Sequence, residues 1–413
     1  MNNWELQRID NVVDIRRGAS PRPIDAFLSE EGMPWVKISD ATASNGRYIY
    51  ETKQFIIEDG IKNSVIVNPE DLIISNSATP ALPKILKIRA CVHDGWLIVS
   101  NYRGITRDFL YYSILYNRKW LLNQGNGSIF KNLKTDILKE FKIKIPPVNI
   151  QNQVSSVLKA IEDKIELNNR INAELEAMVK TLYGYWFVQF DFPIYNQDGT
   201  LSGAEGYKTS GGKMEWNEEL KRVIPEGWKV EPLFKAMDVQ YGFPFSTSKF
   251  TDEVTDKPVI RIRDILENTI STYTTEEVDD KYRLKQNDLL IGMDGNFHLN
   301  FWDKDGAYLN QRSVRIRAKK DSEISNLQAY FELKPYIKAR ENNVSRTTVG
   351  HLSDKDLKRL FLISPSRSDL FKPKNLFENS LSEIISNRLQ NQKLTELRDW
   401  LLPMLMNGQV KVN

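Results

Sequence analysis

The sequence predicts an α+β protein: two similar mixed α/β domains joined by two long antiparallel coiled-coil helices. An internal repeat of about 220 residues and a heptad pattern that occurs once in each copy carry this prediction. The length of 413 residues also exceeds one typical domain. We expect four segments, namely a first globular domain (1–147), a central helical region (148–190), a linker with the second globular domain (191–368) and a C-terminal helical region (369–413).

The repeat keeps its order along the chain, but its offset changes. Trp4 recurs as Trp228 and Gly18 as Gly242, both 224 residues later. The segment 71–75 matches 288–292 at an offset of 217. From Pro146, which matches Pro365, an offset of 219 continues without a gap through the helical segment. Insertions therefore fall inside the globular parts, whereas the helical part has a fixed length.

Each globular copy combines strand and helix patterns. Strands are expected at 65–75, 141–145, 284–292, 313–318 and 361–363 from apolar runs, alternation and flanking turn residues. Helices are expected at 107–122 and 326–340, and shorter ones at 131–140 and 353–360. Cys91 lies in a strand-like run, 84–92, where a core position is the expected role rather than a reactive thiol.

The helical segments carry a coiled-coil seam. From Val154 to Leu182, apolar residues and two asparagines recur at intervals that alternate between four and three residues. This is the a/d spacing of a heptad repeat. The second copy has Pro373, Ser380 and Arg398 on its seam but otherwise keeps the pattern. Such a helix of roughly 35 residues is about 50 Å long. The alternative, amphipathic helices packed separately on their own domains, explains the identical spacing of the two copies less well.

Two asparagines occupy the same seam positions in both copies. If the helices are antiparallel around a pseudo-twofold axis near Arg170, Asn168 faces Asn391 and Asn172 faces Asn387. Polar seam residues cost stability but fix register and orientation. The sequence therefore predicts two cross-helix asparagine pairs.

Enzymatic motifs are absent from the sequence. It has no Gly-x-x-x-x-Gly-Lys-Ser/Thr phosphate loop and no Asn/Asp-Pro-Pro-aromatic motif, and Gly211-Gly212-Lys213 reads as a flexible linker. Of the three histidines, His298 and His351 suit hydrogen bonding better than catalysis, and the set lacks metal-ligand spacing. We expect no catalytic residue, no bound cofactor and no metal site, although nuclease motifs are loose enough to leave a disguised nuclease as an alternative.

Composition limits the class of protein without defining it. A net charge of +3 permits nucleic-acid binding but does not argue for it. One cysteine, no long apolar run and no basic-apolar leader favour a cytoplasmic protein that does not enter a membrane.

Basic and small polar residues recur at loop positions of both copies. Arginine with asparagine or glutamine can read guanine and adenine edges, while serine, threonine and lysine suit phosphates. Each cluster alone is more typical of a solvated loop, but matched loops with different side chains suit two related domains that read different sequences. The candidate DNA-binding residues are Arg16, Arg17, Ser75, Asn76, Ser77, Asn101, Arg103, Ser128, Lys131 and Asn132 in the first copy, and Tyr241, Arg263, Asn296, Asn310, Gln311, Arg312, Arg346, Thr347 and His351 in the second.

Three segments resemble the specificity subunits of type I restriction–modification systems. The run 183–193 (YGYWFVQFDFP) resembles the end of that family's central conserved region. Ser210–Met214 with Ile224–Trp228 resembles the entry to its second recognition domain, and Leu397–Gly408 resembles its chain end. The similarity covers the whole length. One departure is that Trp4 lacks the Ile-Pro-x-Gly lead that precedes Trp228.

The resemblance implies a function that spacing alone does not. The globular domains would be target-recognition domains, each reading one half of a bipartite site in double-stranded DNA. The helices would set the spacer and dock two modification (methyltransferase) subunits, which use S-adenosylmethionine to methylate adenine, and a restriction subunit would join them. A coiled-coil scaffold whose domains bind other proteins is the alternative.

Overall fold

The computed structural model describes residues 4–44, 46–123, 132–193, 207–208, 213–342, 350–365 and 373–410. The chain forms two compact units: Met1–Asn168 with Gln390–Asn413 (unit 1), and Asn169–Leu389 (unit 2). The two long helices, α6 (Val148–Tyr183) and α11 (Pro373–Met406), each contribute to both units. These units do not separate the helical segments from the globular parts, as the four predicted segments do.

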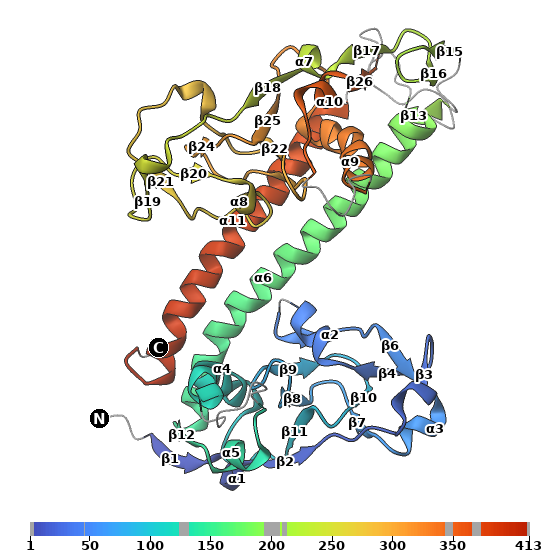
Figure 1. The fold of residues 1–413 in the computed structure, drawn as a ribbon. Helices are drawn as coiled ribbons and strands as arrows, with labels where there is room; N and C mark the ends of the chain where they lie inside the picture. The colour runs from blue at the N-terminus through green and yellow to red at the C-terminus, as the bar shows by residue number, and fades with distance from the viewer. Residues whose placement is uncertain are drawn as a thin grey trace. The chain divides into compact units, whose positions relative to one another are not determined.

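Unit 1 contains two mixed sheets (blue to cyan in Figure 1). One has the strand order β2-β11-β8-β9-β5 and the other β3-β6-β4-β10-β7, while β1 pairs with β12. The strands are β1 (Glu5–Arg8), β2 (Asp14–Arg17), β3 (Leu28–Ser29), β4 (Met33–Val36), β5 (Tyr48–Ile49), β6 (Gln54–Ile56), β7 (Val65–Val67), β8 (Leu72–Ser75), β9 (Pro83–Leu86), β10 (Ala90–Val92), β11 (Trp96–Ser100) and β12 (Lys142–Ile145). The helices before α6 are α1 (Ile9–Val12), α2 (Ile38–Ala43), α3 (Glu58–Ile61), α4 (Arg107–Asn123) and α5 (Thr135–Glu140).

Unit 2 is built around the sheet β18-β25-β22-β23, with β17 paired to β26. Its strands include β17 (Lys229–Pro232), β18 (Met237–Tyr241), β19 (Phe250–Thr251), β20 (Val259–Ile260), β21 (Tyr273–Thr274), β22 (Leu289–Gly292), β23 (Leu299–Phe301), β24 (Tyr308–Leu309), β25 (Ser313–Ala318) and β26 (Phe361–Ser364). They are preceded by β13 (Phe192–Pro193), β14 (Tyr207–Lys208) and the hairpin β15 (Met214–Asn217)–β16 (Arg222–Pro225). Its shorter helices are α7 (Leu233–Ala236), α8 (Ile262–Ile265), α9 (Asn326–Asn342) and α10 (Asp354–Lys358).

The predicted α+β fold class and internal repeat are confirmed at the level of single elements. Helices α4 and α9 begin 219 residues apart and are each 17 residues long. The short helices α2 and α8 are capped alike, because the Asp40 carboxylate accepts from the Lys37 amide and the Asp264 carboxylate accepts from the Arg261 amide. In each copy, the strand just before this short helix forms a parallel pair: β4 with β10, and β20 with β24.

Three predicted strands are shorter than the sequence suggested, and one of them, 284–292, forms a strand only in β22 (Leu289–Gly292). The run 65–75 contains a turn between β7 and β8, in which Glu70 adopts a left-handed conformation (φ 74°) and its amide donates to the Leu86 carbonyl. The run 84–92 is likewise divided between β9 and β10. Pro69 lies in the turn between β7 and β8, whereas residues 87–89, between β9 and β10, include neither glycine nor proline, so the apolar run there does not show where the chain turns. Cys91 is fully buried, as predicted, and burial raises the pKa of its thiol.

The long helices contain the two predicted asparagine pairs, one within each unit. In unit 1 the Asn168 amide donates to the Asn391 carbonyl oxygen at 2.9 Å and to Gln390 at 2.6 Å. In unit 2 the Asn387 amide donates to the Asn172 carbonyl oxygen at 2.9 Å. Residue numbers rise along one helix as they fall along the other, so the helix segments in each unit are antiparallel.

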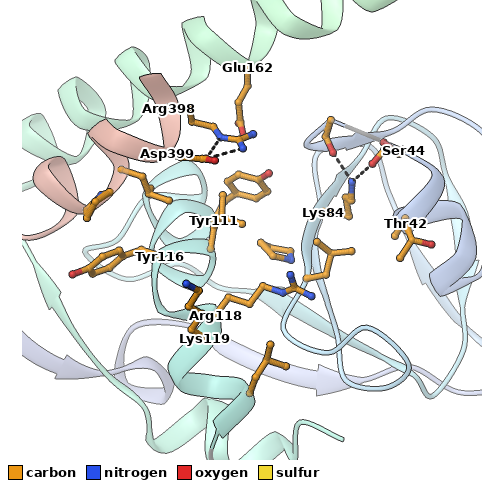
Figure 2. A pocket seen from close by; sticks show the side chains of 18 residues that line it. Thr42, Ser44, Lys84, Tyr111, Tyr116, Arg118, Lys119, Glu162, Arg398 and Asp399 are labelled. Atoms are coloured by element: carbon orange, nitrogen blue, oxygen red, sulfur yellow. Dashed lines mark hydrogen bonds and ion pairs between the residues drawn. The ribbon is translucent and has the colours of Figure 1, made fainter. Parts of the chain in front are cut away.

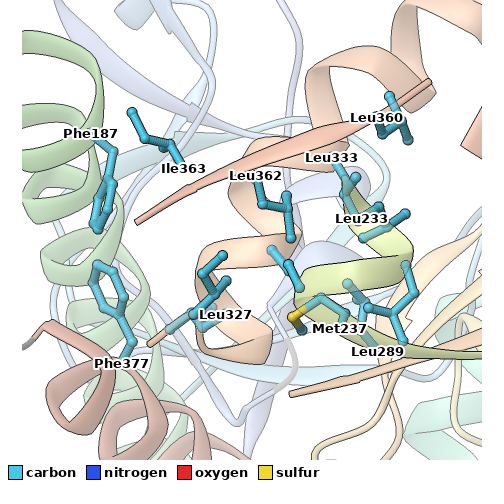
Figure 3. Packing of buried hydrophobic residues seen from close by; sticks show 14 of the residues in the cluster. Phe187, Leu233, Met237, Leu289, Leu327, Leu333, Leu360, Leu362, Ile363 and Phe377 are labelled. Atoms are coloured by element: carbon cyan, nitrogen blue, oxygen red, sulfur yellow. The ribbon is translucent and has the colours of Figure 1, made fainter. Parts of the chain in front are cut away.

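The core of unit 2 joins its sheet to both helices (Figure 3). Phe187, which follows α6, and Phe377 of α11 are fully buried with ring centroids 6.1 Å apart. Leu362 of β26 and Leu289 of β22 belong to the same cluster. Burying side chains of this size stabilises the fold by about 1.5–3 kcal/mol each, so this part of unit 2 holds its helices firmly against its sheet.

Candidate nucleic-acid interface

In unit 1, three neighbouring strands reach the same sheet edge. The β11 strand pairs on both sides, placing Leu97 opposite Arg17 of β2 and Trp96 opposite Ser75 of β8. The loops that follow β2 and β8, and the loop that precedes β11, therefore leave from one edge. This edge collects the residues 18–22, 76–81 and 93–95, which we call tip 1.

The side chains of tip 1 are organised by Asp94. Arg17 Nε donates to the Asp94 carbonyl at 2.6 Å, and Asn76 Nδ2 donates to the same oxygen at 3.1 Å. Ser20 Oγ donates to the Asp94 carboxylate at 3.0 Å, and Arg22 lies 3.6 Å from it. The Arg17 and Arg22 side chains are 59% and 79% exposed, so both guanidinium groups can reach a solvent-side ligand.

His93 is part of the support of tip 1. Its ring lies 6.0 Å from the Trp35 ring and 6.3 Å from the Trp96 ring, and its Nδ1 accepts from the Gly95 amide at 2.8 Å. Burial lowers the pKa of His93 more strongly than the nearby Asp94 raises it. An accepting Nδ1 and a lowered pKa both favour the neutral ring, which suits a structural role.

Unit 2 presents the corresponding edge through different side chains. Tyr241 of β18 lies opposite Val314 of β25, and Gly292 of β22 lies opposite Ser313. The loops 242–246, 293–298 and 310–312 leave from this edge and form tip 2. Here Asp294 accepts from Arg312 Nη1 at 3.1 Å, and its other oxygen lies 2.6 Å from His351 Nδ1.

Arg312 adopts an unusual backbone conformation. Its φ of 67° lies in the left-handed region, which arginine rarely occupies. Strain of this kind persists where the surrounding structure determines it, and it concentrates at functional sites. The Arg312 side chain is 60% exposed, so the loop presents this guanidinium outwards.

The two tips contain equivalent backbone hydrogen bonds, which show which residues of one tip correspond to those of the other. The Leu133 amide donates to the Asn76 carbonyl, and the Leu352 amide donates to the Met293 carbonyl, both at 2.8 Å. These bonds bring Asn132 and His351 to equivalent places, as the internal repeat predicted. Both side chains are exposed.

The structure corrects one part of the predicted loop matching. Asn101 and Arg103 belong to the recurring loop candidates together with Asn310 and Arg312, but they follow the other end of β11 and bind Asp14 at 2.6 and 2.8 Å. The segment equivalent to 310–312 is 93–95, because the offset of 217 that relates β8 to β22 also relates β11 to β25. Sequence reasoning missed Asp94 as a candidate, although applying that offset would have found it.

Of the remaining predicted DNA-binding residues, some bind other groups of the protein and others lie at the tips. Ser75 is buried and its hydroxyl donates to the Thr79 carbonyl, so it shapes the loop. Tyr241 donates to Asp354 at 2.7 Å, and Arg263 donates to Ser271 at 3.1 Å beside α8. The candidates that lie at the tips are Arg17, Asn76, Ser77, Asn296, Asn310, Gln311, Arg312 and His351. Arg16 is exposed near the C-terminal end of strand β2, and Asn132 directly precedes Leu133 in the sequence. Ser128, Lys131, Arg346 and Thr347 lie outside the described residues.

The described residues contain neither a metal-binding group nor a helix able to cross a membrane. No three His, Cys, Asp or Glu side chains among them could hold a metal ion together. None of their helices is long and apolar enough for a membrane span. What the tips offer chemically is hydrogen bonding: guanidinium, amide and hydroxyl groups that can contact phosphates and base edges.

A family model for the type I restriction modification DNA specificity domain matches residues 1–177 and 225–369. The chain belongs to this family. It is 25% identical to the type I restriction enzyme MjaIX specificity subunit of Methanocaldococcus jannaschii, over 99% of this chain and 94% of that protein. It is 23% identical to the HindI specificity subunit of Haemophilus influenzae, over 90% of this chain and 85% of that one.

A solved structure has the same fold. The type I restriction–modification system S subunit from M. genitalium superposes with a TM-score of 0.55 at 13% identity, covering 98% of this chain and 96% of that one. This likeness supports the fold assignment alone.

Proposed function

We propose that this chain is the DNA-sequence-recognition subunit of a type I restriction–modification complex, in which tip 1 reads one half of a bipartite site and tip 2 the other. The observation that carries the proposal is the pair of equivalent tips, built on one scaffold but carrying different side chains. Arg17, Arg22 and Asn76 surround Asp94 in tip 1, whereas Arg312 and His351 surround Asp294 in tip 2. Two domains that bind the same partner would have no need for this difference.

The chemistry of the complex belongs to partner subunits under this proposal. The chain itself is a non-catalytic specificity subunit. Two modification subunits, using S-adenosylmethionine to methylate adenine, would dock on the long helices, and a restriction subunit would join them in the cytoplasm. The scaffold alternative, with domains that bind other proteins, is not favoured by the family match.

The first prediction concerns the arginine of each tip. Arg312→Ala should weaken binding to the second half-site by about 5- to 150-fold, since one good bidentate base contact contributes roughly 1–3 kcal/mol of discrimination. Arg17→Ala should do the same for the first half-site. Mapping methylated adenines in a host that carries this chain with its partners gives the site, and binding of the complex to duplexes with one half-site altered then assigns each effect.

A matched arginine outside the tips is the control. Arg103→Ala removes an exposed side chain bound to Asp14 and should leave both half-sites and the salt dependence unchanged. If a tip arginine contacts phosphate instead of a base, its removal should weaken all duplexes alike and lower the salt slope by about one. Affinity and salt slope both unchanged in Arg17→Ala and Arg312→Ala would remove the tips from the interface.

The second prediction tests whether the helices set the spacer. One heptad inserted after Asn168 and one after Leu389 falls at the boundary between the units and leaves the contacts inside each unit unchanged. Seven residues lengthen a helix by about 10 Å, which corresponds to roughly three base pairs. Methylation mapping should show the same half-sites with a longer spacer. Altered half-sites with an unchanged spacer would contradict the proposed role of the helices.

A further inference from the structure

Unit 1 contains a cavity of about 780 Å³ between its α/β part and the long helices (Figure 2). Its walls come from α4, the loop before β5, β9, α6 and the C-terminal part of α11. Ligand pockets usually have volumes of about 300–1,000 Å³, so a small organic molecule would fit here. No residue of tip 1 lines the cavity, although Arg118 donates to the carbonyl of Pro80 in tip 1.

Two cations of this cavity, buried Lys84 and half-buried Arg118, lack an anionic partner among the described residues, as does Lys119, which is exposed. Lys84 is 4% exposed, and its ammonium donates to the carbonyls of Ser44, at 2.7 Å, and Gly46. Arg118 donates through Nε to the Pro80 carbonyl at 3.3 Å. Within the described parts of the chain, no carboxylate lies within ion-pair distance of either group. Burial lowers the pKa of Lys84 to about 8, against a smaller opposing effect of Glu162, and burial also lowers the pKa of Arg118. The surroundings therefore do not fully compensate either positive charge.

The two acidic groups of the cavity are already paired. Arg398 donates to Asp399 at 2.8 Å and lies 3.8 Å from Glu162. Figure 2 shows this pairing on one side of the cavity, with Arg118 extending from α4 towards the side that carries Lys84. The space between the two uncompensated cations is therefore electrostatically suited to an anion.

Aromatic and apolar side chains complete the wall. Tyr111 and Tyr116 of α4 line the cavity together with Leu115 and Leu122. Tyrosine rings offer flat surfaces against which another ring can stack. The lining thus combines a cationic part with an aromatic part.

The equivalent place in unit 2 shows that the fold does not require these cations. There the cavity is about 190 Å³ and is lined by Asn300, Tyr330, Leu381 and others. Lys84 of β9 pairs with Ile73 of β8, and Asn300 of β23 pairs with Leu290 of β22, which is the residue 217 positions after Ile73; Asn300 is therefore the equivalent of Lys84. The equivalent of Arg118, 219 positions later, is Ile337. Lys180, Lys334 and Arg388 also line this smaller cavity. The second copy of the fold nevertheless forms with neutral residues at the positions of Lys84 and Arg118, so these two cations are not needed to build it.

We propose that the unit 1 cavity binds a small phosphorylated ligand with an aromatic ring, such as a nucleoside monophosphate. Lys84 and Arg118 hold its phosphate, and Tyr111 and Tyr116 contact its ring. This ligand proposal does not rest on base reading at tip 1. If the cavity binds no such ligand, the proposed DNA recognition is unaffected.

Calorimetric titration of the full chain with adenosine monophosphate tests this proposal. Saturable binding is expected, weaker binding with inorganic phosphate, and none with adenosine, which lacks the phosphate. Lys84→Met and Arg118→Met should each weaken binding at least 10-fold, and the matched surface variant Lys144→Met should not. Melting curves of each variant verify folding, and Lys84→Arg should retain binding if positive charge is what matters.

Two outcomes would overturn the proposal. One is the absence of saturable binding at millimolar nucleotide, or equal binding by folded Lys84→Met and Arg118→Met. The other is displacement of the nucleotide by short duplex DNA together with weaker DNA binding by Lys84→Met, which would assign the cations to a DNA phosphate. A DNA affinity unchanged in Lys84→Met but lowered in Arg17→Ala would separate this cavity from tip 1.

Discussion

Arg47→Met is expected to lower the free energy of unfolding of unit 1 by about 3–5 kcal/mol at pH 7, the usual cost of breaking a buried charge network from one side. The Arg47 side chain is fully buried. It donates to Asp108 at 2.8 Å and to the Tyr112 hydroxyl at 3.1 Å, and the Tyr112 hydroxyl in turn donates to Glu162 at 2.8 Å. Methionine keeps much of the volume but removes the ion pair with Asp108 and leaves buried Glu162 with Arg398, 3.8 Å away, as its cation.

The pH dependence of this variant identifies the cause. Burial raises the pKa of Glu162, while Arg47 and Arg398 oppose that rise. Removing Arg47 should raise the pKa further, so the folded state then holds a proton that the unfolded chain releases above its ordinary pKa near 4.5. Stability of Arg47→Met should therefore fall as the pH rises from 5 to 8, more steeply than in the parent chain.

Urea denaturation at pH 5 and pH 8 measures both effects. Arg103→Met, which removes an exposed ion pair, is the matched control and should change little. Arg47→Met with Glu162→Gln should restore part of the loss, because a buried carboxylate that has lost one of its two nearby cations is gone. A loss below about 1 kcal/mol at every pH would show that water compensates Glu162 and that the network is not structural.

The features predicted from sequence are those with a fixed period. The seam of α6 and the constant offset of 219 predicted the register of Asn168, Asn172, Asn387 and Asn391 once a pseudo-twofold axis near Arg170 and Leu389 was assumed, and the observed pairs confirm that register. The mixed strands and helices followed from alternation and helical periodicity. Pro69 marks the turn where β7 meets β8, but the turn where β9 meets β10 has no comparable signal.

The tips were less predictable because contacts between distant segments define them. Asn101 and Arg103 resemble Asn310 and Arg312 in type, but strand register places them at the other end of β11. Arg47 gave no sign of being buried, since its burial depends on Asp108, Tyr112 and Glu162 from two other helices. Residue type alone therefore predicts neither exposure nor the sheet edge to which a loop belongs.

The second large effect is expected at the paired glycines of the tips. A Cβ on Gly18 would lie 2.1 Å from the His93 carbonyl oxygen, and one on Gly242 would lie 1.9 Å from that of Asn310. Both contacts are far below any that a real Cβ makes, and the obstructing atoms are backbone. Gly18→Ala and Gly242→Ala must therefore push the loop after β2 or β18 away from the segment before β11 or β25, breaking backbone bonds such as Gly18 to Trp96 and Gly242 to Ser313.

Each glycine variant should affect only its own half-site under the proposed function. The strain should lower the free energy of unfolding by about 1–3 kcal/mol. Displacing the tip should reduce affinity for the matching half-site by about 5- to 150-fold, because base contacts depend on the loop's position. Binding to duplexes altered in one half at a time measures this, with urea denaturation of the same proteins.

Gly184→Ala is the matched control, since its Cβ would meet nothing within 4 Å. It should leave DNA affinity unchanged and stability unchanged or slightly higher. If Gly18→Ala and Gly242→Ala both lower stability while leaving both half-sites intact, the close approach at each tip is structural and base reading lies elsewhere. If the two variants exchange effects, so that Gly18→Ala alters the half-site assigned to Arg312, the assignment of one tip to each half-site is wrong. Selective loss at the matching half would tie sequence recognition to a backbone contact that both copies share, although the side chains around it differ.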